Sequence, residues 1–171
     1  MTSARPWLRF GVLVAVVAVL PAATAGAGPA ERTAHPESTP ARTIELIAQR
    51  GVLSLPATPA VGAPFVAGGD LLDPAGTKVG EGYSSCLIAK VALPELTSHC
   101  TSAFRLADGE IHLSSLRVYT VQEVTSFKDG PMAVVGGTGA YRDARGEAST
   151  VKQAGDPTKP VSYKFTITLT D

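Results

Sequence analysis

The sequence contains few of the residues that build metal sites and catalytic centres. Its three histidines, His35, His99 and His112, lie far apart, and no two have the spacing of metal ligands. There is no Gly-x-Ser-x-Gly motif around a nucleophile, and the glycine-rich segment lacks the Lys and Ser/Thr that close a phosphate-binding loop. These absences indicate neither a metal nor a nucleotide, and we expect no cofactor.

An excess of one charge is also lacking. The chain has 15 Lys and Arg against 15 Asp and Glu, and residues 1–25 contain two of the basic residues and none of the acidic ones. Without that segment, 13 basic residues would stand against 15 acidic ones, a formal charge of minus two. Nothing in this balance attracts nucleic acid or an anionic membrane surface, so we expect neither as a partner.

Residues 1–25 have the pattern of a secretory signal peptide. Arg5 and Arg9 are followed by an uninterrupted apolar stretch from Phe10 to Leu20 and then by small residues. A transmembrane anchor is the alternative, but the apolar stretch has only about half of the roughly 20 residues that a span needs. We therefore expect a secreted protein with no stable membrane anchor.

The next segment, residues 26–42, is rich in proline, alanine, threonine and charged residues and has no apolar period. Such a composition cannot bury enough apolar surface to fold, so we expect a disordered linker. The remaining residues, 43–171, suit a single domain with one core.

Helical periodicity is nearly absent from residues 43–171, and short alternating segments take its place. From Val161 to Thr170, apolar and polar residues alternate at every position, which is typical of a strand with one buried face. Turn signals separate eight such segments. We expect strands at 43–49, 65–72, 79–88, 98–106, 110–125, 132–138, 146–153 and 161–170. This pattern predicts an all-β fold, an eight-stranded antiparallel β-barrel, because closure removes the exposed edges of an open sheet.

The segment 110–125 breaks its own alternation. Ile111 shares one face with Arg117 and Tyr119, whereas the apolar Leu116 lies on the opposite face. A β-bulge that shifts the register explains this, and it is the interpretation that we favour because long barrel strands commonly bend. The alternative is a barrel whose interior is apolar at one end and polar at the other.

Two cysteines, Cys86 and Cys100, lie in predicted strands on either side of a turn. An even number of cysteines in an exported protein favours a disulfide. Pairing them in register also places Gly82 opposite Phe104, so that a glycine lies beneath a large side chain. The alternative is a reactive thiol at Cys86.

A glycine-rich segment, Met132 to Gly146, joins an apolar strand to a sharp corner at Gly136, Gly137 and Gly139. Together with the segment 70–86, which runs from Asp-Leu-Leu-Asp-Pro to Cys86, it resembles the allene oxide cyclase and dirigent families. Both segments occur in the families' order and at about their spacing. The resemblance implies a small antiparallel barrel that holds an apolar small molecule.

The resemblance also implies a function. Allene oxide cyclases hold an unstable epoxide in its ring-closing conformation, and dirigent proteins steer the coupling of oxidised phenolic radicals. We therefore expect a secreted barrel that binds a hydrophobic small molecule and steers its cyclisation or stereoselective coupling. Whether the chain is an enzyme stays open; if it is one, it is a cofactor-independent isomerase or cyclase. The alternatives are a non-catalytic carrier or scavenger and a packed structural barrel, and relatives that form oligomers allow for a homo-oligomer, a trimer or a dimer.

Candidate site residues follow from the resemblance and from strand position. Arg145 matches the dirigent arginine through its Ala-Arg-Gly context, and Asp70 is a carboxylate near a strand end; both are predicted catalytic residues. A charged residue of the dirigent families is replaced by Ala140, and a disulfide would remove the thiol that matches the cyclase cysteine. The predicted ligand-binding residues are Tyr119, Arg117, Tyr141 and Asp73. Asp73 also fits a plain turn, and both tyrosines also fit a role in the core.

Overall fold

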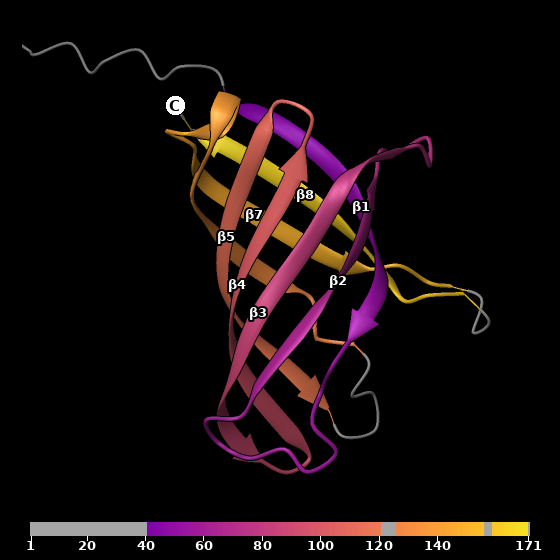
Figure 1. The fold of residues 1–171 in the computed structure, drawn as a ribbon, viewed down its shortest axis with the longest axis vertical. Helices are drawn as coiled ribbons and strands as arrows, with labels where there is room; N and C mark the ends of the chain where they lie inside the picture. The colour runs from indigo at the N-terminus through magenta and orange to yellow at the C-terminus, as the bar shows by residue number, and fades with distance from the viewer. Residues whose placement is uncertain (1–40, 121–125, 156–158, 171) are drawn as a thin grey trace, which may run out of the picture. The chain divides into compact units, whose positions relative to one another are not determined.

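Eight alternating segments of the chain become eight strands of one closed antiparallel barrel in the computed structural model (Figure 1). The structure describes residues 41–120, 126–155 and 159–170. The strands are β1 Arg42–Leu53, β2 Pro64–Leu72, β3 Lys78–Ala92, β4 Glu95–Leu106, β5 Gly109–Thr120, β6 Gly130–Gly137, β7 Arg145–Lys152 and β8 Ser162–Thr170. Each strand pairs with the next, and β1 pairs with β8 to close the barrel. The predicted fold class is confirmed.

The N-terminal predictions cannot be followed into the structure. Residues 1–40, which hold the predicted signal peptide and most of the predicted linker, lie outside the described residues. Arg42, the last residue of the predicted linker, is already the first residue of β1. The far end of the strand predicted at 110–125 also lies outside the described residues, because β5 is described only to Thr120.

The main core of the barrel forms from side chains that alternate inward. On β8, Tyr163, Phe165, Ile167 and Leu169 are all buried, as the perfect alternation of this segment predicts. Phe165 packs edge-on against Phe104, with 4.9 Å between the ring centroids. These residues belong to one apolar cluster of the interior.

A second buried cluster surrounds the disulfide between Cys86 and Cys100. The hairpin of β3 and β4 has the predicted register, with the two cysteines opposite each other and Gly82 opposite Phe104. A Cβ on Gly82 would lie only 2.8 Å from the Phe104 ring, so a glycine is needed at this position. With both sulfurs bonded, the alternative of a reactive thiol at Cys86 does not hold in this structure.

The glycine corner follows β6. Gly136 and Gly139 have φ angles of 146° and 58°, which side chains rarely adopt. A short 3-10 helix, η2 Gly139–Tyr141, then turns the chain toward β7. A Cβ on Gly137 would lie 2.2 Å from the carbonyl oxygen of Glu110, so the corner and β5 approach closely through this glycine.

The interpretation of β5 as a bulged strand is wrong. Its pairing with β4 is continuous from Gly109 to Thr120, and the register shift lies instead on its other side, where β6 has the extra residue. Arg117 and Tyr119 are therefore in phase with Ile111 and face the interior, with exposed fractions of 4% and 2%, whereas Leu116 is 68% exposed. Nor is the interior apolar at one end and polar at the other, as the alternative states. A polar layer that contains Arg117 lies instead between the apolar cluster of Ile111 and Leu113 and the apolar cluster of Tyr119.

Candidate functional site

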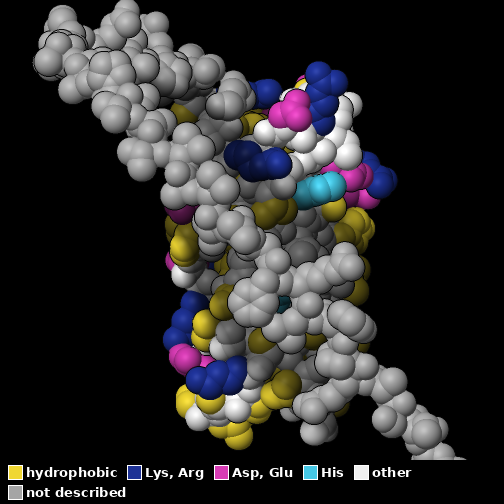
Figure 2. Space-filling model, turned by 90° about the vertical axis from the view of Figure 1, so that its left-hand side faces the viewer, with side chains coloured by type: hydrophobic (Ala, Val, Ile, Leu, Met, Phe, Trp, Pro, Cys, Tyr) yellow, Lys and Arg dark blue, Asp and Glu magenta, His cyan; other side chains and the backbone are white. Residues whose placement is uncertain are grey.

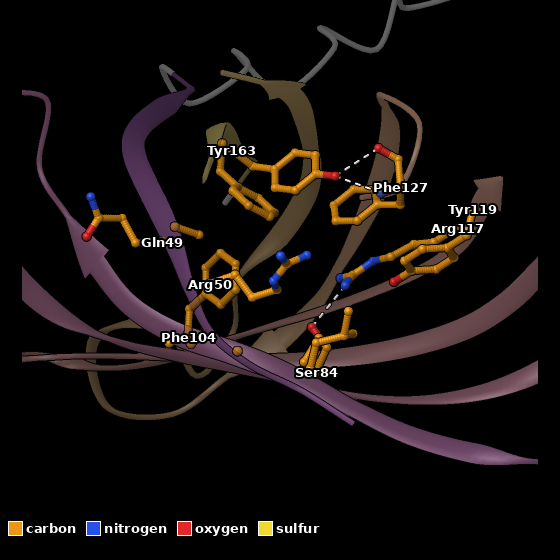
Figure 3. Close-up of a pocket in the computed structure, with 15 residues that line it drawn as sticks. Gln49, Arg50, Ser84, Phe104, Arg117, Tyr119, Phe127 and Tyr163 are labelled. Carbon is orange, nitrogen blue, oxygen red and sulfur yellow. Dashed lines mark hydrogen bonds between the residues drawn. The ribbon is translucent and has the colours of Figure 1, made fainter. Parts of the chain in front are cut away.

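A cavity of about 60 Å³ lies inside the barrel at this polar layer (Figure 3). Aromatic side chains form much of its wall, and glycines of β2 and β3 leave the space beside them. The residues that define it best are Arg50, Ser84, Phe104, Arg117, Phe127 and Tyr163. The cavity is thus largely apolar, with a few polar groups.

Arg117 is the central polar group of the cavity. Its Nε donates a hydrogen bond to Ser115 Oγ (3.2 Å), its Nη1 to Ser84 Oγ (3.0 Å) and its Nη2 to Ser102 Oγ (2.7 Å). The guanidinium carbon also lies 4.8 Å from the centroid of the Phe127 ring, a cation–π contact. Hydroxyl groups from three strands and one aromatic ring therefore hold this side chain in one place.

None of the described carboxylates pairs with Arg117. Burial lowers the pKa of Arg117, and the nearby Tyr119 and Tyr163 act in the opposite direction. Guanidinium stays protonated in proteins, so the interior holds a positive charge. Among the described residues, Arg117 has no ion-pair partner, which is unusual because buried charges are normally paired.

A second arginine, Arg50 of β1, lines the same cavity, and Figure 3 shows its side chain extending into it. Sequence reasoning missed Arg50 because the predicted strand ended at Gln49, whereas β1 continues to Leu53 through an irregularity between Arg50 and Val52. The alternation of the sequence contained this information, because Leu46, Ala48 and Arg50 occupy every second position and face the interior.

Tyr163 and Tyr119 hold the wall of the cavity. The hydroxyl of Tyr163 donates to the carbonyl oxygen of Phe127 (2.9 Å) and accepts from its backbone N–H (2.7 Å). The rings of Tyr163 and Phe127 are stacked, with 4.1 Å between their centroids. Burial raises the pKa of Tyr163 to about 12 and also raises the pKa of Tyr119. Both hydroxyls are therefore neutral over the physiological range.

The structure brings Arg117 and Tyr119 to the cavity, but not the other predicted site residues. Asp70 is half-exposed, and its carboxylate lies 2.8 Å from Lys78 Nζ. Asp73 lies in a turn, where its Oδ1 accepts a hydrogen bond from the Thr77 N–H (2.8 Å). Arg145 is exposed, and its Nη1 donates to the Ala144 carbonyl oxygen (2.7 Å). Tyr141 is buried in the core, and Arg42 lies over its ring. The roles given to these four residues stay predictions.

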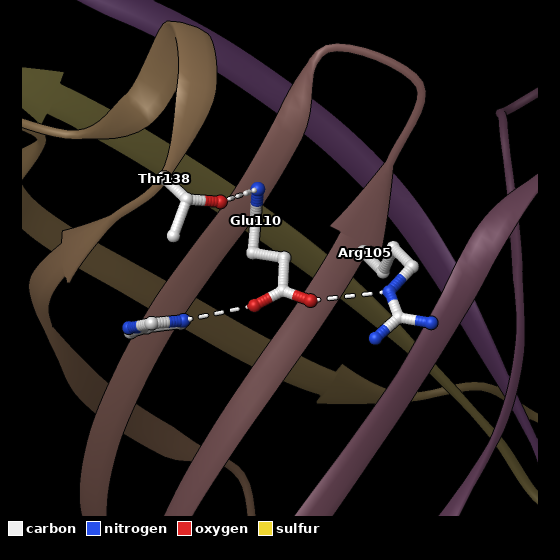
Figure 4. Close-up of polar contacts among 4 residues, drawn as sticks. Arg105, Glu110 and Thr138 are labelled. Atoms are coloured by element: carbon white, nitrogen blue, oxygen red, sulfur yellow. Dashed lines mark hydrogen bonds and ion pairs between the residues drawn. The ribbon is translucent and has the colours of Figure 1, made fainter.

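The outer surface carries a separate polar cluster around Glu110 (Figure 4). Hydrogen bonds, first with His112 and then with Arg105, lower the pKa of Glu110. The backbone N–H of Glu110 donates to Thr138 Oγ1 (3.0 Å), so the cluster ties β5 to the glycine corner. On the face drawn in Figure 2, Lys and Arg side chains likewise lie near Asp and Glu side chains.

The described part of the chain contains neither a metal-binding cluster nor a membrane-spanning helix. None of its His, Cys, Asp and Glu residues form a group of three or more that is able to hold a metal ion. It also has no helix that is long and apolar enough to cross a membrane.

Comparison with known proteins identifies the barrel. The model of a family described as allene oxide cyclase barrel like domain matches residues 43–167. A pyocyanin demethylase structure is 24% identical, with a TM-score of 0.57 over 74% of this chain and 99% of that one. The exo-specific intermolecular Diels–Alderase AbnU is 17% identical, with a TM-score of 0.53 over 75% and 98% of the two chains. The Diels–Alderase AbmU from Streptomyces koyangensis is 16% identical, with a TM-score of 0.53 over 77% of this chain and 69% of that one. Curated protein sequences gave no match.

Proposed function

The chain belongs to the allene oxide cyclase barrel-like family, and we propose that it is a secreted barrel that binds a hydrophobic small molecule and steers its cyclisation or stereoselective coupling. The observation that carries the proposal is the internal cavity, in which aromatic rings surround the buried cation of Arg117. Two of the similar structures are named as Diels–Alderases, and our proposal assigns the same kind of work, control of ring closure, to this barrel.

The chemistry that this cavity offers is conformational and electrostatic. Apolar walls exclude water and hold reacting atoms close together, which removes much of the entropic cost of ring closure. Arg117 is already oriented by three serine hydroxyls, so it stabilises developing negative charge without reorganisation. Such a protein acts as a cofactor-independent isomerase or cyclase.

The size of the cavity defines how a substrate is held. About 60 Å³ is far below the roughly 300–1,000 Å³ of a typical ligand pocket. We therefore propose that the cavity encloses the reacting part of the substrate, while the rest of the molecule lies toward its open side. The same small volume favours the second candidate, a packed structural barrel without a ligand.

Secretion and assembly complete the proposal. The disulfide of Cys86 and Cys100 suits an oxidising compartment outside the cytoplasm. A homo-oligomer, a trimer or a dimer, is proposed from the family resemblance, and exposed apolar side chains on β3 and β5, such as Tyr83 and Leu116, are available on the outer face. Light scattering of the purified protein measures the oligomeric state; a monomer at all concentrations contradicts this part.

Product stereochemistry tests the central function. The protein is incubated with a reactive fatty-acid epoxide and, separately, with oxidised phenols, and the products are compared with those formed without protein. We expect one enantiomer to be enriched by the wild type and by Val151→Ala, an exposed control on β7, but not by Arg117→Met. Racemic products throughout contradict steering of these substrates. Native mass spectrometry then separates a carrier, which retains a ligand, from a packed barrel, which retains none.

The predicted catalytic role of Arg145 is tested in the same assay. Arg145→Ala is expected to reduce the enantiomeric excess more than the stability if the residue touches the substrate. Arg145 is exposed and bonds to the Ala144 carbonyl oxygen. Unchanged stereochemistry in this variant contradicts a catalytic role for Arg145. Asp70→Asn provides the equivalent test for the carboxylate that pairs with Lys78.

A further inference from the structure

The residues that line the cavity have an unbalanced charge. Arg50 and Arg117 line it together, and none of the described residues that line it is an Asp or a Glu. Neither arginine forms an ion pair with any residue that the structure describes. Two cations at one apolar site repel each other and lose hydration, so an anion that entered would be attracted by both.

The polar groups of the site also offer more hydrogen-bond donors than the described residues accept. Nη1 of Arg117 donates to Ser84 Oγ, and the Arg117 side chain also interacts with the hydroxyl of Tyr119. The hydroxyls of Ser84 and Ser102 lie 2.8 Å apart, so one donates to the other and the second hydroxyl hydrogen has no described acceptor. Ser84 and Arg117 both line the cavity. The site therefore offers a hydroxyl hydrogen beside Arg117 that a ligand is able to accept.

A third polar group lies in the same layer. Ser98 is directly opposite Arg117 in the pairing of β4 with β5. Its side chain is completely buried, and its Oγ has no hydrogen-bond partner among the described residues. Buried hydroxyls usually have a hydrogen-bond partner, so Ser98, which does not itself line the cavity, adds one more polar atom to this layer.

The walls beside these donors favour a flat apolar body. The stacked pair of Phe127 and Tyr163 forms one side, and Phe104 and Phe165 form another. A planar ring with one strong acceptor group fits this combination, because aromatic pairs prefer edge-on or offset contacts.

We infer that the ligand of this cavity is a small aromatic or conjugated anion, whose carboxylate, phenolate or enolate oxygen binds Arg117 and Arg50. This inference rests on the proposed function, because it requires that the cavity takes a small molecule. It adds the chemical class: a hydrophobic body with one anionic oxygen group, in place of a wholly apolar ligand.

Three probes with the same ring and different charges test the inference. Binding of benzoate, benzyl alcohol and benzylammonium to the whole secreted protein is measured by calorimetry or ligand-observed NMR. We expect benzoate to bind at least about tenfold more tightly than benzyl alcohol, because a charged hydrogen-bond pair is worth more than a neutral one. Benzylammonium should not bind. Higher salt should weaken the binding of benzoate alone.

Two variants locate the effect. Arg117→Met should remove the preference for benzoate, and Arg50→Gln should weaken benzoate severalfold while leaving benzyl alcohol unchanged. Arg50 is only partly buried and has no ion-pair partner among the described residues, so this variant keeps the test usable if Arg117→Met fails to fold.

The outcomes separate the two proposals. Equal affinities for benzoate and benzyl alcohol, or a preference for benzylammonium, overturn the anionic ligand but leave the proposed function standing. A preference for benzoate that survives both variants also overturns it, because the anion then binds elsewhere. No binding of benzoate or benzyl alcohol overturns both proposals.

Discussion

Replacing Arg117 by methionine should leave the barrel about as stable as the wild type, although Arg117 is only 4% exposed. Methionine has a similar length, and its flexible thioether fills irregular gaps. A buried charged residue of this kind is usually expected to be indispensable. The lack of a described carboxylate partner is the reason for the opposite expectation.

The magnitude follows from the contacts. Removing a guanidinium from water costs several kcal/mol. Against this stand three hydrogen bonds to serine hydroxyls, at about 1.5 kcal/mol each for a charged donor, and one cation–π contact of about 2 kcal/mol. These opposing contributions nearly cancel, so the free energy of unfolding should change by less than about 2 kcal/mol. Ser84 and Ser102 still hydrogen-bond to each other in the variant.

Urea denaturation followed by circular dichroism measures this change, with the m-value showing whether both proteins unfold in the same way. Leu113→Ala is the control, because Leu113 is 1% exposed on the same strand and its truncation should cost about 2–5 kcal/mol. A loss of 3 kcal/mol or more for Arg117→Met, as expected on breaking a buried ion pair, would refute the view that this charge is kept for a ligand.

Three further predictions concern the fold. Replacing both cysteines by alanine should lower the free energy of unfolding by about 3 kcal/mol, because their separation of 14 residues closes a short loop; an unchanged urea midpoint contradicts this. Gly137→Ala should cost about 1–3 kcal/mol through overpacking, whereas Gly130→Ala, whose Cβ meets nothing within 4 Å, should melt close to the wild type; equal melting temperatures would argue against the close approach at the corner. Hydrogen bonds with His112 and Arg105 lower the pKa of Glu110, so the stabilisation by its carboxylate is complete above the usual pKa of 4.5 and is lost as the pH falls below that value. Glu110→Gln should therefore flatten the acid side of the curve of unfolding free energy against pH; parallel curves for the two proteins contradict this.

Local patterns were sufficient to predict the strands and one hairpin. The alternation of β8 identifies its buried face, because the side-chain period of a strand is two. Turn residues delimit the other strands. The register of β3 with β4 followed from one requirement, that Cys86 meets Cys100, and this also placed Gly82 under Phe104.

The site depended on contacts that are distant in the sequence. Nothing local shows that Phe127 lies over Arg117, or that Ser84 and Ser102 accept its hydrogen bonds, because these contacts form only when the barrel closes. The phase of β5 pointed to a polar interior, but a bulge explained the same pattern equally simply. Arg50 was missed because the strand was predicted to end at Gln49, whereas β1 continues through an irregularity to Leu53.

The resemblance to known families predicted the architecture better than the site. Arg145 was chosen by matching a motif and Asp70 as a carboxylate near a strand end, and neither is among the residues that line the cavity. Arg117 and Tyr119 were chosen by strand phase, and both face the cavity. Position within the barrel was thus the more informative criterion.

The most direct test of a ligand site at Arg117 is a crystal structure of the protein soaked with 4-bromobenzoate. The anomalous signal of bromine locates the probe independently of its orientation in the electron density. Our account predicts a bromine peak beside the rings of Phe127 and Tyr163, with the carboxylate on Arg117 and Arg50. A peak confined to the outer surface, or an interior that stays closed to the probe, would contradict it.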